Sequence, residues 1–120
     1  METKGSHAII DLWKPEDELF LTDIDQMRSL VRLAISMGGM TPLEDVHHKF
    51  ETDGYSLVVL LKESHVAVHT YPEHKYMSID IYACGEGDAL KTMKTILSRL
   101  NPEMCIAKVI KRGEYTISDS

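Results

Sequence analysis

The sequence lacks features that define several classes of protein. It has 13 lysines and arginines against 19 acidic residues, a net charge of −6, so the basic face that nucleic-acid binding requires is not expected. No apolar run approaches the roughly 20 residues of a membrane span, and no membrane partner is expected. The first residues lack the apolar core of a signal peptide. We therefore expect a cytoplasmic protein.

Cysteine is equally scarce. The chain has two, Cys84 and Cys105, and in a cytoplasmic protein we expect two reduced thiols instead of a disulfide. No internal repeat, low-complexity segment or linker divides the 120 residues, which are enough for one domain with a modest core. The sequence therefore predicts a single domain over residues 1–120.

Strand and helix patterns alternate along the chain. Apolar residues recur at helical spacing over residues 24–34 and 90–100, and these helices are expected to end at Gly38 and Asn101. Thr22 is the expected cap of the first helix, and the acidic segment after Pro15 is an expected loop. Asp53-Gly54 is typical of a hairpin turn and predicts one between the strands on either side. Strands are predicted over residues 7–12, 43–50, 55–61, 66–70, 77–82 and 105–110.

These elements predict an α+β fold, a two-layer sandwich in which two helices cover one face of an antiparallel sheet. The other face is left partly bare. It is expected to carry His65, His69 and Tyr82, which need water or a partner chain against them.

Polar residues cluster where predicted strands end. His65, His69 and Glu73 form one possible metal-ligand set, but histidines four apart on a strand are about 13 Å apart, so no metal site is predicted. A Cys–His hydrolase using Cys84 and His69 stays open, because nothing in the sequence fixes their distance.

Three motifs carry more information together than separately. They are Glu63-Ser64-His65, His69-Thr70-Tyr71-Pro72-Glu73 and Asp80-Ile81-Tyr82-Ala83-Cys84-Gly85. In order and spacing they resemble the E-S-H, H-T-W-P-E and D-x-[FY]-x-C-G motifs of the S-adenosylmethionine decarboxylase proenzyme family, in its short bacterial and archaeal form. Upstream matches are Gly5-Ser6-His7, His48-Lys49-Phe50 and Gly54-Tyr55-Ser56, so the resemblance spans most of residues 5–110.

The resemblance implies a chain that cuts itself. The Ser64 hydroxyl would attack the Glu63 carbonyl, dividing the chain into residues 1–63 and 64–120 and converting Ser64 into a pyruvoyl group. That covalent group would form a Schiff base with the substrate amine and accept electrons as carbon dioxide leaves, without an external cofactor. Ser56 and His69 match the processing residues of the family, with His69 moving the proton. Cys84 matches the cysteine that protonates the product.

The resemblance also implies a substrate and an assembly. Phe50 and Tyr71 match positions that stack on the adenine of S-adenosylmethionine, and Glu73 matches the acid that holds the ribose hydroxyls. The product would feed spermidine biosynthesis. Two protomers of the family pack sheet on sheet as a homodimer and share residues across the interface.

Three departures from the family pattern concern substrate choice. Tyr71 replaces the usual tryptophan, Ala83 replaces the usual threonine, and the segment around Glu86 and Asp88 is shortened. The leading prediction is S-adenosylmethionine decarboxylase. A pyruvoyl-dependent ornithine or arginine decarboxylase, with Glu86 or Asp88 near a cationic side chain, is an alternative, and an unprocessed non-catalytic homologue is another.

Overall fold

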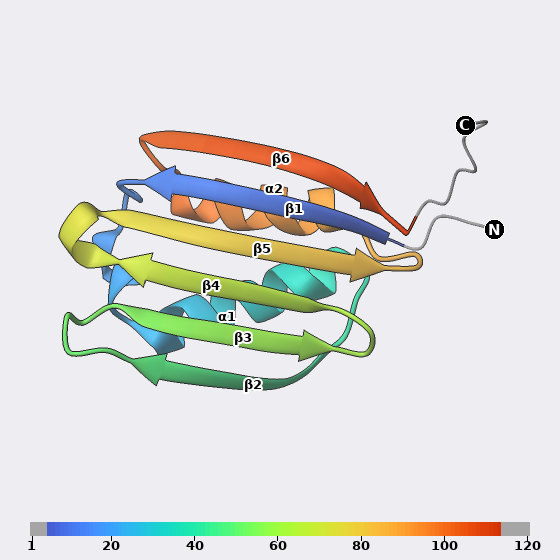
Figure 1. Ribbon diagram of the computed structural model, residues 1–120, viewed down its shortest axis with the longest axis horizontal. Coiled ribbons are helices and arrows are strands. Elements are labelled where there is room, and N and C mark those ends of the chain that lie inside the picture. Colours follow the sequence, from blue (N-terminus) through green and yellow to red (C-terminus); the bar gives the residue numbers. More distant parts are fainter. Residues whose placement is uncertain (1–4, 114–120) are drawn as a thin grey trace, which may run out of the picture.

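A six-stranded antiparallel sheet organises residues 5–113, the part of the chain that the computed structural model describes (Figure 1). The strands are β1 (Gly5–Trp13), β2 (Pro42–Lys49), β3 (Tyr55–Leu61), β4 (His65–Tyr71), β5 (Tyr76–Cys84) and β6 (Met104–Arg112). The helices are α1 (Ile24–Met37) and α2 (Ala89–Leu100), with 3-10 turns η1 (Glu18–Leu21) and η2 (Pro72–His74). All six predicted strands and both predicted helices are present.

The sheet order is β2-β3-β4-β5-β1-β6, so the first and last strands lie next to each other. On β1, which lies between β5 and β6, Ala8 pairs with Ile81 of β5 on one side and with Val109 of β6 on the other. Both helices lie behind the same face of the sheet, as Figure 1 shows. The predicted α+β sandwich is therefore confirmed.

Alternation along the strands separates the two faces. On β4 the side chains of Val66, Val68 and Thr70 are buried beneath the helices, while His65 and His69 on the opposite face are half-buried. Because successive strand residues point to opposite faces, the same period places Tyr82 on the open face. The prediction that the bare face carries these polar rings is confirmed for a single chain.

The start of α1 differs from the prediction. Asp23, not Thr22, is the N-cap residue, and its side chain accepts a hydrogen bond from the Gln26 amide at 3.2 Å. The Thr22 amide instead donates to the Leu19 carbonyl at 3.0 Å and closes η1. The segment after Pro15, predicted as a loop, therefore contains a 3-10 turn. Thr22 is the C-cap residue of this turn and not the N-cap residue of α1.

The strand connections fall at two opposite ends of the sheet. Figure 1 shows the β3–β4 turn and the end of β5 together at one end, with the β2–β3 turn and the β4–β5 connection at the other.

Neither α1 nor α2 in the described residues has the length and apolarity that a membrane crossing needs.

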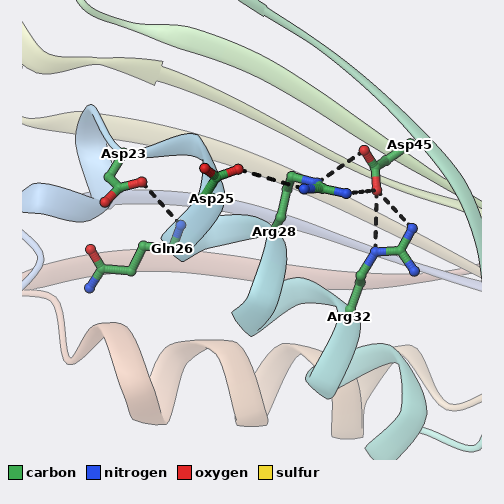
Figure 2. Close-up of polar contacts among 6 residues, drawn as sticks. All are labelled: Asp23, Asp25, Gln26, Arg28, Arg32 and Asp45. Carbon is green, nitrogen blue, oxygen red and sulfur yellow. Dashed lines mark hydrogen bonds and ion pairs between the residues drawn. The ribbon is translucent and has the colours of Figure 1, made fainter.

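An ion-pair cluster connects α1 to the edge strand β2. The Asp45 carboxylate, whose side chain is only 6% exposed, accepts hydrogen bonds from Arg28 Nε at 3.1 Å and from the Arg32 guanidinium at 2.7 Å (Figure 2). Arg28 also approaches Asp25 at 3.6 Å. Hydrogen bonds from Arg32 and then Arg28 lower the pKa of Asp45 below its ordinary value of 3.8.

We predict that Asp45→Asn lowers the free energy of unfolding by about 1 kcal/mol at neutral pH, since both arginines are partly exposed and water screens the pairs. The folded-state pKa of Asp45 is depressed, so its contribution is present above pH 3.8 and is lost as the pH falls further. Urea unfolding across that pH range should show the two proteins converging in acid. Glu44→Gln on the same strand is the control, and equal stability of both variants at pH 7 contradicts the prediction.

Candidate active site

The tight turn between β3 and β4 presents Glu63 and Ser64 to the end of β5. The turn is closed by a hydrogen bond from the Leu61 amide to the Ser64 carbonyl at 2.9 Å. Since His65 pairs with Tyr82, the next outward position of β5, Cys84, lies alongside this turn. The strand register therefore brings the predicted cleavage site and the predicted catalytic cysteine together.

Cys84 contacts both the Glu63 carbonyl and the Ser64 hydroxyl. Its amide donates a hydrogen bond to Ser64 Oγ at 2.9 Å, and its Sγ donates to the Glu63 carbonyl oxygen at 3.0 Å. The hydroxyl and the carbonyl that self-cleavage would join are thus each fixed by the same residue. Cys84 is a free cysteine and is half-buried.

A hollow of about 510 Å³ opens beside this turn. Its walls combine the turn, the segment after β5 and the segment after α1, including Met40, Ser64, Cys84 and Glu86. Gly87 packs against Met40, because a Cβ at Gly87 would lie 2.6 Å from the Met40 sulfur. The residues that follow Cys84 therefore form a wall of the hollow.

The departures from the family motif have different positions in the structure. Glu86 lines the hollow beside Ser64. Asp88 is the N-cap of α2 and accepts a hydrogen bond from the Lys91 amide at 3.0 Å, so its carboxylate is already engaged. Ala83 is fully buried on the helix side of β5 and does not face the hollow. Whether Ala83 affects substrate choice stays a prediction.

The other predicted residues gather at the opposite end of the sheet. Ser56 Oγ and His69 Nδ1 lie 2.7 Å apart as partners in the β3–β4 ladder. Both line a hollow of about 350 Å³ whose other walls include Phe50, Tyr71 and Glu73. Five residues that the sequence singled out separately thus surround one space.

Two turns position this second group. In the β2–β3 turn the Phe50 amide donates to the Gly54 carbonyl at 2.8 Å, and Asp53 adopts a left-handed φ of 72°. A Cβ at Gly54 would lie 2.6 Å from the Thr70 carbonyl oxygen, so only glycine allows the hairpin to approach β4. Pro72 then begins η2 directly after Tyr71, which confirms that β4 ends there.

The two groups are far apart within one chain. His69 pairs with Ser78, and Cys84 lies six residues beyond Ser78 along β5, which corresponds to about 20 Å. One chain therefore does not bring His69 to Ser64. The Cys84–His69 pair of a hydrolase is not formed within the chain either. Among residues 5–113 no three metal-ligating side chains cluster.

Sequence reasoning missed the residues behind Tyr71. The Tyr71 ring stacks on the Tyr76 ring, with centroids 5.4 Å apart and planes at 24°. The Tyr76 hydroxyl in turn donates to the Asp11 carboxylate. The pairing of Tyr71 with Tyr76 follows from a short connection between two predicted strands, so that signal was present in the sequence. The position of Asp11 depends on a long-range pairing that the sequence does not reveal.

Known proteins match this arrangement over nearly the whole chain. The sequence profile of the S-adenosylmethionine decarboxylase family matches residues 6–113. The S-adenosylmethionine decarboxylase proenzyme of Persephonella marina is 36% identical over 97% of this chain and 87% of its own length. The proenzyme of Archaeoglobus fulgidus is 32% identical over 91% of this chain and 97% of its own. The crystal structure of the adenosylmethionine decarboxylase from Aquifex aeolicus superposes with a TM-score of 0.84 at 30% identity, covering 100% of this chain and 98% of that one.

The two-layer fold, the serine at the strand junction and these relatives together define the class, which is a decarboxylase of the proenzyme type. The chain belongs to the S-adenosylmethionine decarboxylase family. The family predicted from the motifs is therefore confirmed, and with it the main functional interpretation of the sequence.

Proposed function

We propose that this chain cuts itself between Glu63 and Ser64, carries the resulting pyruvoyl group at position 64, and decarboxylates S-adenosylmethionine for spermidine biosynthesis. Family membership supports the reaction. The observation that carries the proposal is the pair of hydrogen bonds from Cys84 to Ser64 Oγ and to the Glu63 carbonyl, at 2.9 and 3.0 Å. They hold the two reacting groups at the edge of one hollow.

The proposed cleavage balances without an external reagent other than water. Ser64 Oγ attacks the Glu63 carbonyl carbon, the peptide C–N bond breaks, and the hydroxyl proton passes to the freed amine, leaving an ester. Loss of the Ser64 α-proton then breaks the Cβ–O bond, which releases the Glu63 carboxylate and leaves a dehydroalanine. Its imine form takes up water and releases ammonia, and the new chain begins with a pyruvoyl group.

The Cys84 thiol beside position 64 can assist both the cleavage and the chemistry of the pyruvoyl group. The Cys84 thiol donates a hydrogen bond to the Glu63 carbonyl oxygen. The same bond would stabilise the negative charge that develops on this oxygen during the attack. After cleavage the same thiol lies next to position 64 and is available to give a proton to the product carbon. The pyruvoyl group, once formed, supplies the electron sink for loss of carbon dioxide.

The separation of the two polar groups supports a homodimer with shared sites. Ser56 and His69 lie about 20 Å from the Ser64 end of the same chain. Both lie on the side of the sheet opposite α1 and α2. If two chains pack open face to open face about a two-fold axis, the histidine end of one meets the serine end of the other. His69 of one chain then moves the proton for Ser64 of its partner, with Ser56 fixing the imidazole.

The hollow around His69 supports the nucleoside substrate. Phe50 and Tyr71 are 46% and 43% exposed, so each ring leaves surface available to a flat base. Glu73 lies at the same hollow and is exposed. A carboxylate accepts hydrogen bonds from both hydroxyls of a ribose diol. Ornithine and arginine offer neither a base nor a diol.

We predict that Ser64→Ala leaves a single uncut chain, because no hydroxyl remains to attack the carbonyl. Intact mass under denaturing conditions should show two fragments for the wild type, residues 1–63 and a blocked piece from residue 64. Ser98→Ala, on the exposed side of α2, is the control and should be cut like the wild type. A wild-type chain that stays whole after long incubation contradicts the proposal.

We predict that Glu73→Gln reduces kcat/KM for S-adenosylmethionine about tenfold, because hydrogen bonds to a charged acceptor contribute about 1.5–3 kcal/mol. Self-cleavage should stay close to the wild-type rate. Carbon dioxide release and fragment formation are measured on the same samples. Glu51→Gln in the neighbouring β2–β3 turn is the charge-matched control. If wild-type protein uses ornithine or arginine and not S-adenosylmethionine, the substrate assignment is wrong.

A further inference from the structure

Three aromatic rings from three neighbouring strands form a stack on the open face of the sheet. Tyr71 of β4 stacks on Tyr76 of β5, with centroids 5.4 Å apart and an interplanar angle of 24°. Trp13 of β1 lies against Tyr76, with centroids 5.2 Å apart and planes at 34°. The stack follows the ladder register, in which Tyr76 pairs with Tyr71 on one side and with Trp13 on the other.

Tyr76 is fixed by a polar contact as well as by its neighbours. Its hydroxyl donates a hydrogen bond to the Asp11 carboxylate across the β1–β5 ladder. Burial, followed by the bond to Asp11, raises the pKa of Tyr76 to about 12, so the phenol keeps its proton at any physiological pH. The orientation of the Tyr76 ring is therefore fixed by the ring contact with Trp13 and by the hydrogen bond from its hydroxyl to Asp11.

Tyr76 is behind Tyr71 and not in the hollow. The hollow around His69 is lined by Tyr71, Phe50 and Glu73, and Tyr76 is not among its lining residues. Any effect of Tyr76 on a bound molecule must therefore pass through Tyr71. An exposed tyrosine with no neighbour would lose rotamer freedom when a flat ligand stacks on it, and that loss reduces affinity. A ring that is already stacked on another avoids most of this loss.

We propose that Tyr76, held by Asp11 and Trp13, is a positioning residue that fixes the Tyr71 ring in the orientation needed to stack on the base of a nucleoside substrate. This inference rests on the proposed function, because it concerns the same substrate pocket. It also accounts for how a tyrosine serves where a tryptophan offers more area: the ring is smaller, but its orientation is set in advance.

The test compares two variants at position 76. Tyr76→Leu removes the stacked ring, and Tyr76→Phe keeps the ring and loses only the bond to Asp11. We expect Tyr76→Leu to weaken binding of 5′-methylthioadenosine, an uncharged adenine nucleoside, about three- to tenfold, and to raise KM for S-adenosylmethionine by a similar factor. The value of kcat and the extent of self-cleavage should stay within about twofold of the wild type. Tyr76→Phe should recover most of the lost affinity.

The single tryptophan supplies an independent readout, since Trp13 is the only one in the chain. Its fluorescence should respond when methylthioadenosine binds to the wild type and should lose that response in Tyr76→Leu. The proposal is overturned if the wild type does not bind methylthioadenosine, or if Tyr76→Leu binds it as tightly as the wild type. It is also overturned if Tyr76→Leu lowers kcat and cleavage while KM is unchanged, which is the result of a purely structural role. Absence of S-adenosylmethionine turnover in the wild type instead contradicts the proposed function, whatever the binding result.

Discussion

The antiparallel register between β4 and β5 is the constraint on which the rest of the structure depends. It pairs His65 with Tyr82 and thereby sets Cys84 against the Glu63–Ser64 turn, where Cys84 donates hydrogen bonds to the Ser64 hydroxyl and to the Glu63 carbonyl. A slip of one residue would turn every β4 side chain to the opposite face. The polar rings would then enter the core, and Val66 and Val68 would leave it. The core and the candidate site are therefore fixed by the same pairing.

If His69 acts on Ser64 as we propose, the same register makes a single chain incomplete as a catalyst. It places the serine end and the histidine end at opposite ends of the strands. It also leaves polar and apolar side chains together on the face opposite α1 and α2. Ile9, Leu60 and Ile106 on that face are 38%, 45% and 62% exposed. Apolar exposure of this kind favours association. In the proposed homodimer, this face is a shared wall of two active sites.

Much of this arrangement could be predicted from local sequence. The alternation in residues 66–70 and the glycines and prolines at strand ends place the elements and the open face. Other features could not be predicted, because they depend on contacts between distant residues. Thr22 and Asp23 are both good caps, and only the 3-10 turn before them decides which one is used. Whether Asp11 reaches Tyr76 depends on a strand pairing that no local pattern contains.

The measurement that tests this account most directly is self-cleavage in mixed dimers. His69→Ala and Ser64→Ala chains, distinguished by tags of different mass, are co-expressed and the mixed species is purified. The account predicts that neither variant cuts itself alone, and that in the mixture the His69→Ala chain is cut at Ser64, because its partner supplies the histidine. The Ser64→Ala chain should stay whole. An uncut His69→Ala chain in purified mixed dimers, or a His69→Ala chain that cuts itself alone, contradicts the shared site.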